Sequence, residues 1–394
     1  MRTARVLMVM GTRPEAIKLA PLYRVLKKED SIELKVCVTG QHRDLLDQLL
    51  RNLEMESDWD LGLMQPNQSL SAISAECMRA LPYVFQDFNP DLLLVQGDTV
   101  SAVVAAWVSF FHKVPIGHIE AGLRTRKNFS PFPEEMNRKM LSCLADLHFC
   151  PTERSRKNLM REGVDEKFTF ITGNTSIDAL RLEWFKNRSF PHLDPLFNGK
   201  KLVLVTAHRR ENFGEAHDRV FQAIRYLARN FKDYRFVIPV HPNPLVSQSA
   251  HQNLEGEAGV SLIPPLDYSE LVYLLRNASC VMTDSGGLQE EAPSLGIRTF
   301  VLREDTERPE ALETPFASRV GTQADSIISQ FQNAVLRGEF TSKPFWTGNS
   351  PFGDGHAAEG IATVLKYWWH AVNAWSPDLM RECPPWSHHQ EIRI

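Results

Sequence analysis

The sequence lacks a long hydrophobic run, a strong excess of one charge and cysteines spaced for disulfide or metal chemistry. Its first apolar run, residues 5–10, is too short for a membrane span, and no small-residue cleavage site follows it. The 44 Lys and Arg residues are balanced by 48 Asp and Glu residues, so the basic excess typical of nucleic-acid binding is missing. We expect a soluble cytoplasmic protein that binds neither membranes nor nucleic acids.

Motifs for metals and cofactors are also scarce. The six cysteines show no C-x-x-C spacing, and several lie inside apolar runs, which is typical of buried thiols in a reducing compartment. The acidic pair Asp58 and Asp60 follows a polar segment and is interpreted as structural. The glycine motif at 353–358 has no strand before it, so it does not fit a dinucleotide fingerprint. We expect no metal and no cofactor.

The 394 residues exceed the roughly 250–300 at which a single core stops growing. Short apolar runs, each followed by a helical pattern, recur along the chain, as is typical of parallel sheets covered on both faces. The runs are 5–10, 34–40, 91–98, 114–120, 146–150, 201–208, 235–241, 261–265, 278–284 and 298–303.

These runs form two groups of about five strands, separated by a polar segment at 187–201 that we interpret as a linker. The pattern predicts an α/β fold with two Rossmann-like, doubly wound domains facing a cleft. Ligands are then expected at the carboxyl ends of the strands. We place the domains at 1–185 and 186–355, expect the helical pattern at 356–375 to pack back on the first domain, and regard 376–394 as a tail.

Polar side chains follow the predicted strands of the first domain. Arg13 stands at the start of a helix with Lys18 one turn further, which favours an anion site, although a plain helix start would look the same. Asp98, Glu120 and Glu134 follow neighbouring strands. Asp98 alone could be only an N-cap, but three carboxylates are more than capping needs, and they would suit proton transfer at a sugar carbon.

In the second domain, His208, Arg209 and Arg210 follow one predicted strand and His241 the next. A lone histidine is more often structural, whereas this group favours diphosphate binding or acid–base chemistry. Arg308 follows a later strand in an "RPEA" stretch that repeats residues 13–16.

The stretch "TDSGGLQEEAPSLG" (283–296) combines glycines with acids. We expect Ser285, Gly286 and Gly287 to form a turn whose amides point at an anion. Glu290 and Glu291 are expected in the first helical turn, where carboxylates favour the helix dipole. Alternatively, one of them accepts hydrogen bonds from two ribose hydroxyls. A nucleoside diphosphate would satisfy both halves of the stretch.

Ten motifs then occur in order over about residues 6–365: "GTRPEAIKLAPL", "QHRDLLDQ", "QGDT", "HIEAGLRT", "SPFPEEMNR", "ITGNTSIDAL", "TAHRREN", "TDSGGLQEEAPSLG", "TERPEA" and "PFGDG". Together they resemble the non-hydrolysing UDP-N-acetylglucosamine 2-epimerases. The resemblance implies a glycosyltransferase-B-like architecture, a homodimer, and an isomerase that interconverts UDP-N-acetylglucosamine (UDP-GlcNAc) and UDP-N-acetylmannosamine (UDP-ManNAc) for polysaccharide synthesis. The route it implies is anti elimination of UDP to 2-acetamidoglucal, followed by re-addition.

The resemblance also implies roles for residues. Asp98, Glu120, Glu134 and His208 match the catalytic groups, although which of them removes the proton stays open. Glu291 matches the ribose ligand, so Glu290 keeps the structural interpretation. The substrate-binding positions are Arg13, Lys18, Arg209, His241, Ser285, Gly286, Gly287, Glu291 and Arg308. Many relatives bind a second UDP-GlcNAc as an activator, and the matching residues are Gln41, Gln68, Arg209 and His241, with departures at Asp44 and Asn67.

Three other functions stay open from the sequence. A hydrolysing 2-epimerase would release UDP and free N-acetylmannosamine, because water captures the glycal. A glycosyltransferase with the same fold would need an acceptor and would bring no solvent deuterium to carbon 2. A nucleotide-sugar sensor would bind without turnover.

Overall fold

A computed structural model describes residues 2–40, 49–63, 65, 68–197, 199–209, 212–340, 343–348 and 350–374. The chain divides into two compact units. Unit 1 comprises Met1–Ala179 and Phe352–Ile394, and unit 2 comprises Leu180–Pro351. In the described part of the chain, no helix is long and apolar enough to cross a membrane.

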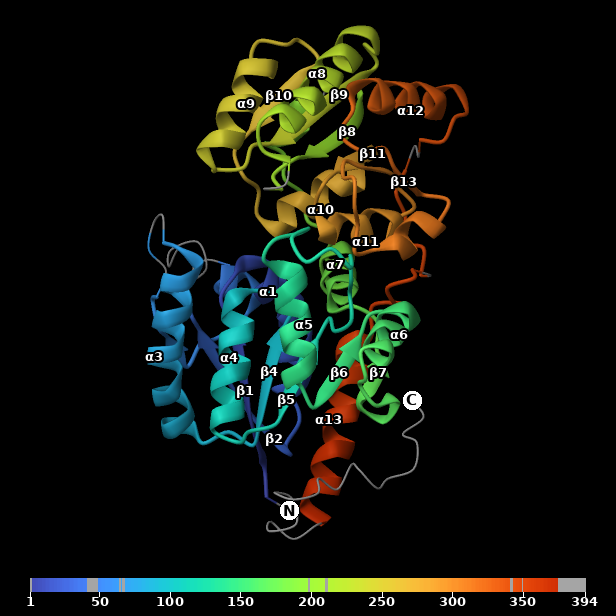
Figure 1. The fold of residues 1–394 in the computed structure, drawn as a ribbon. Coiled ribbons are helices and arrows are strands. Elements are labelled where there is room, and N and C mark those ends of the chain that lie inside the picture. The colour runs from blue at the N-terminus through green and yellow to red at the C-terminus, as the bar shows by residue number, and fades with distance from the viewer. Residues whose placement is uncertain are drawn as a thin grey trace. The chain divides into compact units, whose positions relative to one another are not determined.

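Unit 1 is built on a parallel sheet of order β3-β2-β1-β4-β5-β6-β7, drawn in Figure 1. Its strands are β1 (Ala4–Met10), β2 (Ile32–Val38), β3 (Trp59–Asp60), β4 (Leu92–Gln96), β5 (Ile116–Ile119), β6 (Leu147–Cys150) and β7 (Thr169–Ile171). Its helices are α1 (Arg13–Leu26), α3 (Leu70–Phe88), α4 (Val100–Phe111), α5 (Glu134–Leu144), α6 (Glu153–Arg161) and α13 (Ala357–Ala374), with a 3₁₀ turn at Glu166–Phe168.

Helices cover both faces of this sheet because successive side chains of a strand point to opposite sides. In β1, Met8 and Met10 belong to the cluster that includes α1 and α13. Leu7 and Val9 belong to the cluster that includes α3 and α4. The indole Nε1 of Trp369 donates to the carbonyl of Arg2 over 2.9 Å, so α13 is tied to the segment just before β1.

Unit 2 has a second parallel sheet, of order β10-β9-β8-β11-β12-β13. α8, α9 and α12 share one apolar cluster on it. The strands are β8 (Lys201–Thr206), β9 (Tyr234–Pro239), β10 (Val260–Ile263), β11 (Ala278–Thr283), β12 (Arg298–Val301) and β13 (Ala317–Arg319). The helices are α8 (Glu215–Asn230), α9 (Pro244–Leu254), α10 (Tyr268–Asn277), α11 (Gly286–Ser294) and α12 (Ala324–Leu336), with 3₁₀ turns at Asp194–Leu196 and Pro309–Glu313.

The ten predicted runs all contain strands, and three short strands, β3, β7 and β13, extend the sheets at their edges. The boundary between Ala179 and Leu180 falls inside α7 (Thr175–Lys186). The segment interpreted as a linker is part of unit 2. Its Leu193 is buried, and the hydroxyl of Tyr273 in α10 donates to Asp194.

Candidate active site

Unit 1 reverses its strand order between β1 and β4, where a doubly wound sheet opens a crevice at the carboxyl ends of its strands. Gly11 follows β1 in a place without room for a side chain, because a Cβ would lie 2.6 Å from the hydroxyls of Thr39 and Ser101. Arg13 is the first residue of α1. The buried carboxylate of Glu15 accepts from the Gly11 amide over 3.0 Å and from the Thr99 hydroxyl over 2.7 Å. It therefore ties the loop after β1 to the loop after β4.

Glu120 directly follows β5 and is 5% exposed. Its backbone has a φ of 67°, a left-handed conformation that non-glycine residues seldom adopt. Its Oε2 atom accepts three hydrogen bonds: from Lys18 Nζ over 2.5 Å, Asn174 Nδ2 over 2.9 Å and Gln96 Nε2 over 3.1 Å. The structure thus joins two predicted residues, Lys18 and Glu120, and surrounds them with two amides that the sequence reasoning did not select.

Asp98 follows β4 on a turn made by Gly97, and it does not cap the next helix. Thr99 is the N-cap of α4, and its hydroxyl accepts from Ala102 N over 3.1 Å. The carbonyl of Gly97 is fixed by the Nε2 atom of buried His118 over 2.7 Å. The Asp98 carboxylate is 25% exposed, and it is not used to cap a helix.

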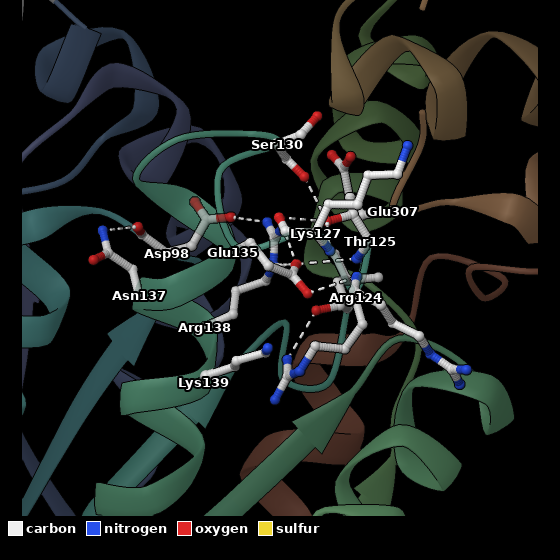
Figure 2. A network of polar contacts seen from close by, with 12 residues as sticks. Asp98, Arg124, Thr125, Lys127, Ser130, Glu135, Asn137, Arg138, Lys139 and Glu307 are labelled. Carbon is white, nitrogen blue, oxygen red and sulfur yellow. Dashed lines mark hydrogen bonds and ion pairs between the residues drawn. The ribbon is translucent and has the colours of Figure 1, made fainter. Parts of the chain in front are cut away.

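A buried arginine supports Asp98 (Figure 2). Arg138 Nη1 donates to Asp98 Oδ2 over 2.5 Å, and its Nη2 donates to Glu135 Oε2 over 2.7 Å. Burial raises the pKa of Glu135, but the amides of Thr125 and Arg126 and the Arg138 guanidinium outweigh that effect, so its pKa is lowered overall. Glu135 is thus an anion that positions Arg138. Glu134, the predicted residue beside it, is the first residue of α5.

In unit 2 the strand order reverses between β8 and β11, and His208 lies at that point. Buried Asp284 accepts from the backbone amides of His208 and Arg209, both over 2.8 Å, and its Oδ1 lies 3.3 Å from His208 Nδ1. Burial lowers the pKa of His208, and Asp284 partly offsets that effect. The ring of His241 stacks on His208 at a centroid distance of 5.6 Å and an interplanar angle of 11°. The two predicted histidines therefore lie together.

The glycine stretch begins a helix earlier than expected. Ser285 is the N-cap of α11, and Gly286 and Gly287 are already helical. The expectation that Glu290 and Glu291 occupy the first turn is therefore wrong, because the helix starts at the glycines and places both acids in the second turn. The Ser285 hydroxyl makes no capping hydrogen bond, so the amides of the first turn remain available to an anion.

The two acids have different partners. Glu290 is fully buried and pairs with Arg308, which also pairs with Glu307. Glu291 accepts from the hydroxyl of Tyr268 over 3.1 Å. The Arg308 guanidinium lies against Gly286, where a Cβ would come within 2.6 Å of its Nη1 atom. Arg308 is thus placed at the start of α11 by an internal acid.

The predicted activator set is described only in part. Gln68 forms a local turn in which its Oε1 accepts from the Gln65 amide over 3.2 Å. Gln41 lies outside the described residues, as do Asp44, Asn67 and Arg210. Among the residues that the structure describes, no group of three His, Cys, Asp or Glu could hold a metal ion.

The sequence is similar to those of known proteins. The sequence profile of the UDP-N-acetylglucosamine 2-epimerase family matches residues 24–366. The UDP-N-acetylglucosamine 2-epimerase of Yersinia pestis is 44% identical over 372 residues, which cover 92% of this chain and 98% of that protein. The chain belongs to this family. The prediction of an isomerase is confirmed by that membership.

Solved structures support the same family. The crystal structure of the Neisseria meningitidis UDP-GlcNAc 2-epimerase bound to UDP-GlcNAc has a TM-score of 0.87 and 42% identity, covering 92% of this chain and 100% of that one. The S. aureus MnaA–UDP co-structure has a TM-score of 0.88 and 38% identity, covering 94% and 97%. The predicted α/β fold with two Rossmann-like domains is confirmed for this member of the epimerase family.

Residues that the sequence reasoning missed share one property: they act on a predicted residue from another element. Gln96 is the last residue of an apolar strand, and Asp284 is the last residue of the predicted run 278–284. Gln96 and Asp284 could have been selected because each is a polar residue at the end of a buried apolar run. Such positions face the crevice of a parallel sheet. The other missed residues are Arg138, Asn174 and Tyr268.

Acid is expected to destabilise this epimerase fold through two buried histidines. Burial lowers the pKa of His118 to about 4 and that of His148 to about 3. An unfolded histidine titrates near 6.5, so below that pH the unfolded chain binds more protons and the free energy of unfolding falls. Between pH 7 and pH 4 the loss is roughly 3 kcal/mol for each histidine.

Urea unfolding at pH 7, 5.5 and 4.5 measures this loss, and a flat profile would contradict it. Burial raises the pKa of Asp178 to about 6. That residue works with the opposite sign, since its folded-state proton adds stability as the pH falls through 6, and it offsets part of the loss.

Proposed function

We propose that the protein is a non-hydrolysing epimerase that interconverts UDP-GlcNAc and UDP-ManNAc. The observation that carries the proposal is the pair of carboxylates, Asp98 and Glu120, at the ends of adjacent strands β4 and β5. Inverting carbon 2 requires one group to take a proton from one face and another to return it to the opposite face. Family membership and the UDP-GlcNAc bound in the Neisseria meningitidis relative support this choice of substrate.

The proposed reaction has two halves. A carboxylate from the set Asp98, Glu120 and Glu134 removes the proton at carbon 2, and the electron pair forms a carbon 1–carbon 2 double bond as the bond to the UDP oxygen breaks. The products are 2-acetamidoglucal and UDP. A proton is then added to carbon 2 from the other face while UDP attacks carbon 1 again, so no water is consumed.

Unit 2 is proposed to hold the leaving group. The open amides at the start of α11 and the guanidinium of Arg308 would bind the diphosphate, while Glu291 would accept from the ribose hydroxyls. His208, placed beside Asp284, is proposed to protonate or hydrogen-bond the departing phosphate. Arg13 and Lys18 of unit 1 are proposed to bind the substrate.

One experiment tests this function. The protein is incubated with UDP-GlcNAc in deuterium oxide and followed by NMR. The expected result is an equilibrium mixture with UDP-ManNAc that carries one deuterium at carbon 2. Free N-acetylmannosamine with stoichiometric UDP would replace the proposal by hydrolytic epimerisation, and absence of both deuterium and a new sugar would favour a sensor.

The two glycines of α11 offer a paired test of the diphosphate cradle. A Cβ at Gly286 would displace Arg308, whereas a Cβ at Gly287 would meet only Glu291 Oε1 at 3.9 Å. Calorimetric titration with UDP should show an affinity loss of about tenfold or more for Gly286→Ala, which is the scale of one charge-assisted hydrogen bond. For Gly287→Ala, space exists in the protein itself, so any loss would come from the bound phosphate. Wild-type affinity in both variants would contradict the cradle.

We further propose a homodimer and retention of the activator site. On α4, Trp107, Phe110 and Phe111 are 41%, 60% and 66% exposed, and their spacing places them on one helix face. An aromatic patch of this kind is typical of protein interfaces. Light scattering should give twice the chain mass for the wild-type protein and the mass of a single chain for Phe110→Glu.

For the activator site, His241 and Arg209 are the candidates among the described residues. If the site is retained, the rate should depend sigmoidally on the UDP-GlcNAc concentration.

A further inference from the structure

Three donors from three different elements hold one oxygen of Glu120. Lys18 comes from α1, Gln96 from the end of β4, and Asn174 from the loop between β7 and α7. Convergence on a single oxygen fixes the plane of the carboxylate. The left-handed backbone of Glu120, with φ at 67°, costs free energy that the surrounding contacts must outweigh. The position of this carboxylate is therefore imposed by its neighbours.

The chain that returns to unit 1 from unit 2 fixes Asn174. The backbone amide of Asn174 donates to the carbonyl of Phe352 over 2.7 Å. Beside it, Gly173 (φ 83°) and Gly353 (φ 110°) let the two backbones meet, since a Cβ on Gly173 would lie 3.0 Å from the Phe352 carbonyl. Four residues after Gly353, the helix α13 begins. Its first amides, Ala357 N and Ala358 N, donate to Asp178 over 3.1 and 2.7 Å.

We infer that Asn174 and Gln96 are positioning residues for Glu120, and that the "PFGDG" segment (351–355) holds Asn174 in place. The inference rests on the proposed epimerisation, in which Glu120 is one of the proton-transfer groups. A carboxylate that accepts or returns a proton at carbon 2 must keep a fixed direction toward that carbon, and a shift of about 1 Å can cost on the order of 100-fold in rate. The glycine motif that failed as a nucleotide fingerprint thus gains a structural purpose.

Asn174→Asp is the direct test, because it removes the donor and keeps the side-chain oxygen that accepts from Ser176 N over 3.3 Å. It also sets a second carboxylate against Glu120. The kcat should fall about 100-fold with KM within about threefold, the signature of a lost transition-state contact. The acidic limb of the kcat profile should move to higher pH, since like charges raise a carboxylate pKa. Lys18 and His118 are further titratable groups that interact with Glu120.

Asn253→Asp is the matched control. Asn253 also donates its side-chain amide to a carboxylate, that of Asp218 over 3.0 Å, in unit 2. This variant should keep the wild-type kcat and pH profile. If Asn174→Asp is folded and matches Asn253→Asp in both, the positioning role is overturned. If Asn174→Asp does not fold, Gln96→Glu takes its place: a kcat loss of about tenfold or more with an unchanged KM supports the role, and a wild-type kcat overturns it.

Gly173→Ala tests the returning segment without touching any donor. Its Cβ would push Phe352 and Asn174 apart, so kcat should fall as in Asn174→Asp while UDP affinity, measured by calorimetry, stays within about twofold. A wild-type kcat would remove the role assigned to residues 351–355. Wild-type protein that yields neither UDP-ManNAc nor deuterated sugar would instead overturn the epimerisation itself, so the two failures are distinct.

Discussion

Asp98→Asn is expected to lower kcat by about 1,000-fold. The rate of deuterium incorporation at carbon 2 should fall by the same factor. The amide has nearly the shape of the carboxylate but cannot take up a proton, and general acid–base groups contribute about 10² to 10⁴ in rate. The side chain is 25% exposed, and Arg138 keeps its pair with Glu135, so the variant should lose less stability than one that lacks Arg138. Initial rates and denaturant unfolding measure the two effects.

Asp91→Asn is the control for this change. Asp91 directly precedes β4, whereas Asp98 follows the other end of that strand. The Asp91 carboxylate accepts from the Arg5 backbone amide over 2.9 Å. It should leave kcat unchanged. A kcat for Asp98→Asn within about threefold of wild type would exclude Asp98 from proton transfer and assign both steps to Glu120 and Glu134.

Arg138→Met is expected to destabilise the protein by about 3–5 kcal/mol, because it leaves a buried carboxylate without its counter-charge. Arg138 is 1% exposed and Glu135 is fully buried. Asp98 also loses its ion pair with Arg138, so kcat should fall as well, by about 10-fold or more. Denaturant unfolding and initial rates at a temperature well below the transition separate the two losses.

Two further variants bracket this prediction. Arg79 pairs with Glu76 over 2.7 Å on the surface, and Arg79→Met should cost under about 1 kcal/mol. Arg138→Lys keeps a charge but lacks the fork that contacts two carboxylates, so its loss should be intermediate. Equal stability of Arg138→Met and wild type would show that the ion pairs do not stabilise this part of unit 1.

Much of the fold could be predicted from local patterns, and what was missed has a physical reason. Long apolar runs such as 91–98 and 201–208 are distinctive because strands buried on both faces carry apolar side chains at every position. The strands β3, β7 and β13 have two or three residues, so they are too short to form such a pattern. Their pairing is decided by neighbouring strands at the sheet edge.

The candidate site likewise contains residues that could be predicted from local sequence patterns and residues that could not. Asp98, Glu120 and His208 could be selected because each directly follows a predicted strand. Arg138 and Asn174 could not, because Arg138 lies on the inner side of a helix and Asn174 depends on a contact with Phe352, more than 170 residues further along the chain. The start of α11 was misplaced because glycine is a poor helix former, whereas the structure begins the helix at Gly286, against the Arg308 guanidinium.

The return of the chain into unit 1 has a consequence for biosynthesis. Ile361, Leu365, Trp368 and Trp369 of α13 belong to the same apolar cluster as β1 and α1, whereas unit 2 is one continuous segment. During translation, unit 2 can therefore complete its core while unit 1, most of which precedes it in the chain, still exposes the apolar surface that α13 will cover. A message cut short before codon 357 would thus spare unit 2 and leave unfinished the unit that holds Asp98 and Glu120.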